Sequence, residues 1–150
     1  MRVSVKKVIL VALVACICGV SGLGFAQTAD KLPQGLWKVE KIIKEKNTNG
    51  KIDTVVYSSD VNMNSVPLPQ KWEIKDSQTI VWHYANGVKQ PVEYTIENGQ
   101  LMITTTTIQP YQYSISGEIL TLKMIYSYTN YLHTGRAERI IENWTITLKK

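Results

Sequence analysis

Residues that could perform catalysis or hold a metal are few and scattered in this chain. His83 and His133 are its two histidines, and neither has a carboxylate at the spacing of a metal-binding pair. The two cysteines, Cys16 and Cys18, lie in one short apolar stretch near the start. No Gly-x-Ser-x-Gly, phosphate-binding loop or His-Glu-x-x-His pattern occurs. The sequence therefore predicts no cofactor and no metal, and we do not expect an enzyme.

Carboxylates in strand-like segments are the one acid–base alternative. A pair of them across one end of a barrel could exchange protons with a substrate. Because charged side chains are rarely buried, we expect them to be exposed. His83 alternates with Trp82 and Tyr84, so it should face away from them, toward solvent. The carboxylates concerned are Glu40, Glu73, Glu93 and Glu142.

Aromatic side chains are the remaining candidates for a functional site. The sole phenylalanine is Phe25, so the bulky interior must be built from Trp and Tyr, whose N–H and O–H groups need partners when buried. A cavity lined by them would offer a small molecule apolar contact and a few oriented hydrogen bonds. The same aromatics could equally fill a small barrel. The predicted ligand-binding residues are Trp72, Trp82, Tyr84, Tyr94, Tyr113 and Tyr126.

The segments that carry these side chains are predicted to be a succession of β-strands. Large residues recur at every second position, which is the pattern of a sheet with one buried face. Asn-Gly pairs between the segments suit tight hairpin turns. The segment from Leu36 to Ile43 also fits a helical face, but its context favours a strand. The expected strands include residues 72–74, 80–84, 92–96, 120–124 and 140–148.

A weak internal repeat indicates how the strands connect. Tyr94 to Ile103 aligns with Tyr113 to Leu122, and each copy is a strand end, a turn and a new strand. Repeated hairpins favour an antiparallel up-and-down meander of about eight to ten strands, which removes its edges by closing into a barrel. The fold class is therefore all-β. We expect irregular loops at Asp60–Gln70 and Thr129–Gly135, and a strand at the threonine run 104–107.

Gly35-Leu36-Trp37 opens the first strand of this meander and resembles the Gly-x-Trp of lipocalins. The similarity is closer to short lipocalin-like domains of Bacteroidetes-type secreted proteins, which also have a hairpin like that from Tyr113 to Leu120. The resemblance implies a lipocalin-like (calycin) barrel over residues 35–150. It also implies a binding protein for a small apolar or amphipathic molecule. The alternative is a filled barrel whose loops bind another envelope protein or a glycan.

In lipocalins a basic side chain packs over this tryptophan. An even number of strands brings the last strand beside the first, so Trp37 should be buried near the chain end. Arg136 and Arg139 begin the last strand and would lie near the opposite mouth. Only Lys149 or Lys150 is placed to cover Trp37, and we assign Lys149, with Gly35 and Trp37, to the structural motif.

The first 26 residues resemble a secretory signal peptide. A basic start with Arg2 and Lys6 precedes an apolar stretch, residues 8–18, and small residues follow up to Ala26. Cleavage before Gln27 would leave a short lead, residues 27–34, and then the barrel. The sequence thus predicts a secreted or periplasmic protein and leaves its oligomeric state open.

Cys16 offers a second way of processing. The stretch from Leu13 to Cys16 resembles a bacterial lipobox, in which Cys16 would be lipidated and hold the protein at the outer membrane. Residues 17–26 remain apolar, whereas a lipoprotein normally continues into a polar tether. The soluble cut is therefore preferred, and we expect membrane attachment only if Cys16 is lipidated.

Removing the signal also removes most of the basic character. The whole chain has 17 basic and 12 acidic residues. Three basic residues and no acidic residue lie in the signal, so 14 basic and 12 acidic residues remain and the net charge is +2. Because so weak a charge attracts polyanions little, we expect no nucleic-acid partner.

The processing site is directly testable. We expect the exported protein to begin at Gln27, because small residues precede that cut and no polar tether follows Cys16. The intact mass of the protein recovered from the culture medium or periplasm measures this. A mass that fits a chain starting at an acylated Cys16 would contradict it.

Overall fold

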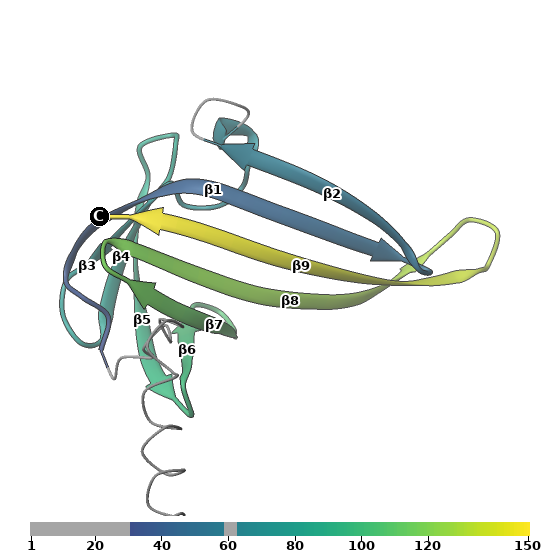
Figure 1. Cartoon of the computed structure of the whole chain (residues 1–150). Coiled ribbons are helices and arrows are strands. Elements are labelled where there is room, and N and C mark those ends of the chain that lie inside the picture. The colour runs from purple at the N-terminus through teal and green to yellow at the C-terminus, as the bar shows by residue number, and fades with distance from the viewer. Residues whose placement is uncertain (1–30, 59–62) are drawn as a thin grey trace, which may run out of the picture.

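A computed structural model gives the fold of residues 31–58 and 63–150, which form nine β-strands and one short 3-10 helix (Figure 1). The predicted signal peptide, Cys16 and the first residues of the lead lie outside this described part. No helix of the described part is long and apolar enough to cross a membrane. The elements are β1 (Gly35–Thr48), β2 (Lys51–Ser58), η1 (Met63–Ser65), β3 (Lys71–Ile74), β4 (Thr79–His83), β5 (Lys89–Glu97), β6 (Gln100–Thr104), β7 (Ile108–Ser116), β8 (Ile119–Tyr131) and β9 (Ala137–Lys149).

The strands form one antiparallel sheet that closes on itself. From β3 to β9 each strand pairs with the next in sequence, and β1 pairs with both β3 and β9. Eight strands therefore make a closed barrel, and β2 is an extra strand that pairs with β1. This confirms the predicted all-β, up-and-down, lipocalin-like barrel.

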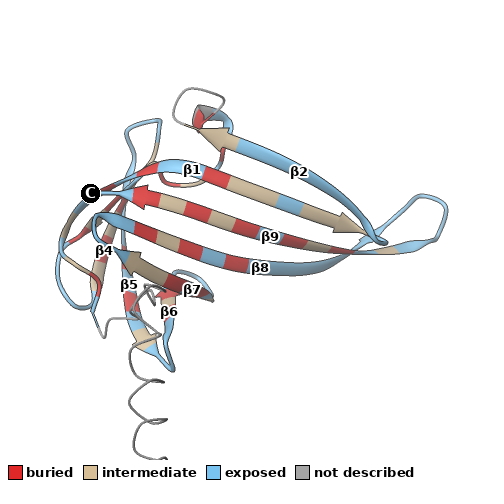
Figure 2. Cartoon of the chain, in the orientation of Figure 1, coloured by how far each residue is buried: buried red, intermediate tan, exposed pale blue. Residues whose placement is uncertain are grey.

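Inward and outward positions alternate as the sequence pattern predicts (Figure 2). In β4, Ile80 and Trp82 are buried while their neighbours are partly exposed. The internal repeat corresponds to two hairpins, β5–β6 and β7–β8. The first turns at Asn98-Gly99, where φ is +51° and +73°, the left-handed region that these two residues tolerate.

Three strands continue well beyond the barrel. β1, β8 and β9 have 14, 13 and 13 residues, and their far ends form with β2 a projecting four-stranded sheet that we call the arm (Figure 1). β1 turns from the barrel into the arm at Glu40, where its register with β9 shifts. Before this bulge β1 pairs with β3, and after it β1 pairs with β2. A bulge bends and twists a strand, which suits a change of partner.

Two local predictions were wrong. The expected loop Thr129–Gly135 is shorter, because β8 continues to Tyr131 and pairs there with Ala137. Pairing with β9 supplies hydrogen-bond partners for the backbone groups of residues 129–131, and the turn starts at Leu132. The threonine run is not a strand throughout. β6 ends at Thr104, and the Thr105 N–H then donates to the Thr107 carbonyl 3.0 Å away, which forms a turn.

Trp37 closes one end of the barrel, as the Gly-x-Trp pattern predicts. Its side chain is fully buried, and its Nε1 donates to the Pro33 carbonyl at 3.0 Å. The cation over the indole is Lys150, whose Nζ lies 6.0 Å from the ring centroid, so the assignment to Lys149 was wrong. Strand alternation explains the difference, since the exposed Lys149 faces outward and the next residue faces back.

Gly35 is required by this arrangement. Its φ is +128°, a conformation that side chains disfavour. A Cβ there would come within 2.9 Å of Lys150 Cε, where the lysine stem crosses the strand. The glycine therefore admits the cation that covers Trp37.

Replacing Trp37 by Ala should destabilise the protein by about 3–5 kcal/mol, as for other large buried aromatics. The neighbouring Leu36→Ala is the matched control, because Leu36 is 41% exposed and should lose less than about 1 kcal/mol. Urea melts measure both. Equal, small losses would show that the closed end does not depend on Trp37.

Candidate ligand-binding site

Three tryptophans lie opposite one another on neighbouring strands. Trp37 on β1 pairs with Trp72 on β3, which pairs with Trp82 on β4. The rings of Trp72 and Trp82 are 5.5 Å apart between centroids and tilted by 51°. Tyr111 of β7 meets Trp72 edge to face at 6.1 Å. Such aromatic contacts add stability beyond area burial, and they hold the indoles in one arrangement.

The rings of Trp72, Trp82 and Tyr111 form one wall of a cavity inside the barrel, whose opening we call the barrel mouth. Its volume is about 300 Å³, at the lower end of the range for small-molecule sites. The segment Pro67–Pro69 and the turn after β6 complete the wall. The lining is Ile42, Pro67, Leu68, Pro69, Trp72, Trp82, Tyr84, Thr105, Thr107, Gln109, Tyr111, Tyr126 and Ile146. A wider hollow of about 600 Å³ adjoins it and shares Trp82, Tyr84 and Thr105.

Two hydrogen-bond donors of this wall lack partners. Trp72 and Trp82 are 2% and 8% exposed, and neither Nε1 meets an acceptor among the described residues. The other two indoles are satisfied: Trp37 donates to a backbone carbonyl and Trp144 to Glu142. Buried N–H groups in folded proteins nearly always have a partner. Two unpartnered donors in the wall of one cavity are therefore a rare feature that calls for an explanation.

Phenol groups complete the polar side of the cavity. Burial raises the pKa of Tyr111 well above its usual value, and the nearby Tyr126 and Tyr84 raise it further, so these hydroxyls stay neutral. The Tyr84 hydroxyl donates to Gln90 Oε1 at 3.3 Å. Tyr111 was missed in the sequence, although it stands two positions before Tyr113 and must share its face.

The structure brings four of the six predicted ligand residues together and places two elsewhere. Trp72, Trp82, Tyr84 and Tyr126 line the cavity. Tyr94 and Tyr113 are buried but are not part of its lining. The Tyr94 hydroxyl instead donates to the Asp76 carbonyl at 2.9 Å, beside the β3–β4 turn. Alternation gives the face of a strand but not the depth along the barrel, which explains this error.

A buried carboxylate lies just beyond the cavity, where the arm begins. Glu142 is 7% exposed, so its predicted exposure was wrong. Its Oε1 contacts Lys44 Nζ at 3.0 Å and accepts a hydrogen bond from the Tyr128 hydroxyl at 3.1 Å. Its Oε2 accepts from Trp144 Nε1 at 3.1 Å, and the Lys44 ammonium lies 4.8 Å from the Trp144 ring centroid. These three partners replace the water that burial removes.

This cluster adjoins the cavity through the strand register. Glu142 lies opposite Tyr126, which lines the cavity, and Lys44 follows Ile42 on the same face of β1. Burial by itself raises the pKa of Glu142, but the hydrogen bonds from Lys44, Trp144 and Tyr128 outweigh it and lower the pKa. The carboxylate is therefore charged at neutral pH.

The histidine and the remaining strand carboxylates do not join this site. His83 faces away from the cavity, and its Nε2 lies 3.1 Å from Glu73 Oε2 on the outer surface. Within residues 31–58 and 63–150, no three His, Cys, Asp or Glu side chains gather as metal ligands.

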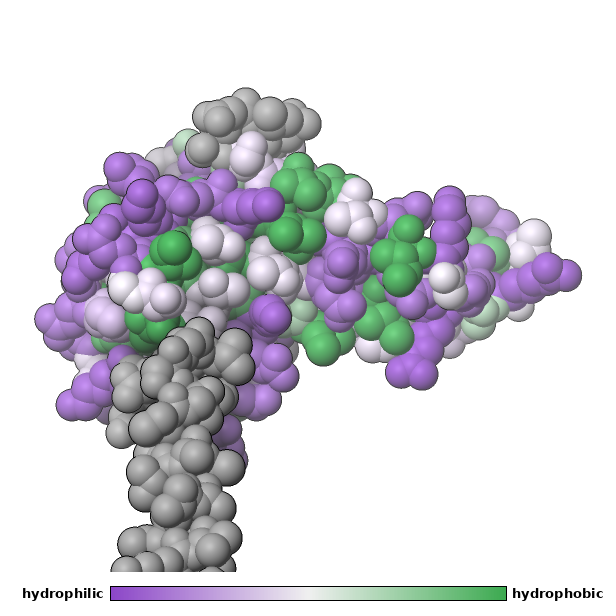
Figure 3. Space-filling model, viewed as in Figure 1, coloured by the Kyte–Doolittle hydropathy of each residue, from purple (hydrophilic) through white to green (hydrophobic). Residues whose placement is uncertain are grey.

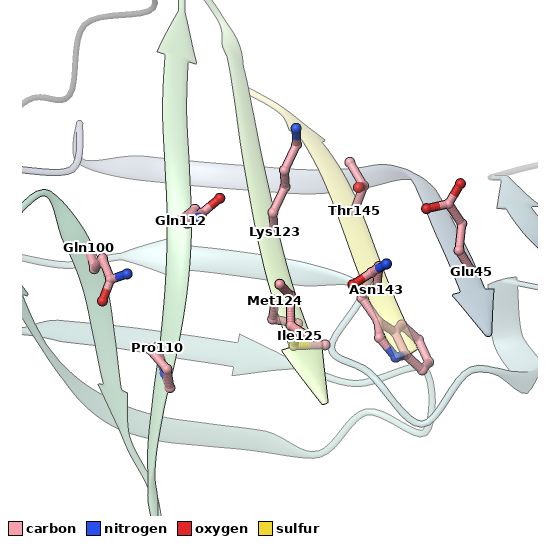
Figure 4. Close-up of a pocket in the computed structure, with 10 residues that line it drawn as sticks. Glu45, Gln100, Pro110, Gln112, Lys123, Met124, Ile125, Asn143 and Thr145 are labelled. Carbon is pink, nitrogen blue, oxygen red and sulfur yellow. The ribbon is translucent and has the colours of Figure 1, made fainter. Parts of the chain in front are cut away.

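A second hollow of about 330 Å³ lies against the outer face of the sheet (Figure 4). Polar side chains such as Gln112, Lys123 and Asn143 project around it. Neither of the unpartnered indole donors belongs to its lining. The cavity at the barrel mouth is therefore the better candidate for a specific small-molecule site.

No family model, curated protein or solved structure matches this chain, so these comparisons supply no relative whose function could be compared.

Replacing Glu142 by Gln should lower stability at neutral pH and remove a pH-dependent contribution. Since folding lowers the pKa of Glu142, its contribution is present above the unfolded-state pKa and is lost as pH falls through the folded-state value. The loss on substitution should be about 1–3 kcal/mol near pH 7 and should shrink below about pH 4.5. Urea melts of both proteins between about pH 7 and pH 3 measure it.

The comparison with the variant isolates this one carboxylate. Glu73 and Asp76 also have lowered pKa values, but they are present in both proteins and cancel in the difference. A stability difference that stays constant over the whole pH range would mean that folding leaves the pKa of Glu142 unchanged.

Proposed function

We propose that this protein is a secreted, lipocalin-like binding protein that holds a small apolar or amphipathic molecule in the cavity at the barrel mouth. The observation that carries the proposal is the chemistry of the lining. It combines indole and phenol rings with aliphatic side chains, and two of its buried donors, on Trp72 and Trp82, have no partner among the described residues. A wall of this kind suits recognition by shape and a few hydrogen bonds.

The lining favours binding over catalysis. Every described side chain that lines the cavity is apolar or uncharged at neutral pH, and burial holds the phenol of Tyr111 further from ionisation. Such groups orient a molecule and exclude water, but they do not supply a strong acid, base or nucleophile. Apolar contact with one small ligand can support micromolar affinity, about −8 kcal/mol.

The arm supports a second candidate, an interaction module that binds another envelope protein or a glycan. Ile52 and Val56 on β2 and Ile125 on β8 share its outer face and are 62%, 50% and 65% exposed. Figure 3 shows apolar side chains among polar ones along the arm. Exposed apolar groups of this kind often mark contact surfaces.

Ligand binding should appear in the tryptophan fluorescence. Fatty acids, sterols, bile acids and flat aromatic compounds are the first probes, and a true ligand should change the emission saturably in the micromolar range, about 1–100 μM. Trp82→Phe should remove much of this change, because Trp82 lines the cavity. Trp144→Phe is the matched control, since its indole already has a partner outside the cavity.

Two results would turn the interpretation toward the second candidate. One is a broad screen without a saturable signal or thermal shift. The other is a signal that Trp144→Phe removes and Trp82→Phe leaves intact.

A further inference from the structure

We infer that the molecule held at the barrel mouth is uncharged and flat, and that it carries a hydrogen-bond acceptor at its buried end, received by the indole N–H groups of Trp72 and Trp82. This inference rests on the proposed function and adds the chemical class of the ligand. A carbonyl oxygen or an aromatic ring nitrogen is such an acceptor.

The unpartnered donors carry the argument. Both indoles are more than nine-tenths buried, both line the cavity, and their rings lie 5.5 Å apart between centroids. A buried N–H without an acceptor has lost its hydrogen bond to water and gained none in return, which is unfavourable. A ligand that brings an acceptor removes this cost, whereas one of the same shape without an acceptor leaves it in place. The cavity should therefore select for the acceptor.

The absence of charge in the lining excludes an ionised group at that end. Among the residues that the structure describes, no Lys, Arg or His lines the cavity, so a buried carboxylate would lose its water without gaining a counter-ion. Lys44, which follows the lining residue Ile42 on the same face of β1, already pairs with Glu142 at 3.0 Å. A cation at that end would offer no acceptor to the two indole N–H groups, and no carboxylate of residues 31–58 and 63–150 lines the cavity to pair with it.

The shape of the ligand follows from the rings. Trp72, Trp82 and Tyr111 present aromatic surfaces at defined tilts, 51° and 88° between neighbouring planes. Planar rings gain most from stacked or edge contacts with such a wall. A volume of about 300 Å³ holds a two-ring molecule more readily than a long chain or a sterol.

Three naphthalene probes of nearly equal size test the inference. They are 2-acetylnaphthalene, which has a neutral acceptor, 2-ethylnaphthalene, which has none, and 2-naphthoate, which is charged. Equilibrium dialysis measures all three at neutral pH without using tryptophan emission. We expect the acetyl probe to bind about tenfold or more tighter than the ethyl probe and tighter than the naphthoate.

Variants show whether the indole N–H groups cause this preference. Trp72→Phe and Trp82→Phe keep an aromatic ring but remove the donor, so each should reduce the acetyl-to-ethyl affinity ratio toward one. The ethyl probe reports any change in cavity shape separately. Trp144→Phe, whose N–H bonds Glu142, should leave the ratio unchanged, and thermal melts confirm that each variant is folded.

The outcomes separate the inference from the proposed function. Equal binding of the acetyl and ethyl probes, or tightest binding of the naphthoate, overturns the inference while small-molecule binding stands. An acetyl preference that survives both tryptophan substitutions also overturns it. Failure of all three probes to bind at any concentration up to their solubility counts against the cavity as a site for small aromatic molecules and so against both.

Discussion

The pairing of the first strand with the last is the constraint on which the structure depends. β1 and β9 join residues about a hundred positions apart, such as Val39 and Leu148, and this contact turns an open meander into a barrel without edges. It also places the chain end beside Trp37, so that Lys150 can cover the indole across Gly35. A contact so distant in sequence slows folding, because the chain must lose loop-closure entropy before the contact forms.

One strand serves two structures because of a single irregularity. At Glu40 the bulge in β1 ends its pairing with β3 and lets it continue beside β2, while β9 follows it on the other side. The barrel wall therefore continues into the arm without a break. Along β1 the inner face changes from apolar at Ile42 to charged at Lys44. Glu142 is buried at the point where the apolar part of the wall ends. There the ion pair with Lys44 and the two hydrogen bonds replace the water that burial removes from the Glu142 carboxylate.

Strand periodicity predicted the fold class and the inward faces, because a two-residue repeat depends only on backbone geometry. It did not predict depth along the barrel, which depends on strand tilt and on the stagger between neighbours. Tyr94 and Tyr113 were therefore grouped with the mouth residues, and Tyr111, beside a proline in its strand, was overlooked. The arm escaped prediction for a related reason. β2 and the far end of β8 are exposed on both faces, so they carry little alternation, and only pairing with distant strands makes them regular. The burial of Glu142 likewise requires partners from three separate positions that no local pattern reveals.

A barrel interior without phenylalanine has a consequence for specificity. Each buried Trp and Tyr brings a donor that must be satisfied, and the protein does so away from the mouth: Trp37 through a backbone carbonyl, Tyr94 through another, and Trp144 through a carboxylate. Phenylalanine at Trp72 and Trp82 would fill similar space without an unsatisfied N–H group. Retaining indoles at these two positions costs stability unless something at the mouth accepts their hydrogen bonds. Under the proposed function, the two donors that weaken the empty barrel are also the groups that would discriminate among ligands, since an acceptor-bearing molecule recovers that cost and an isosteric hydrocarbon does not.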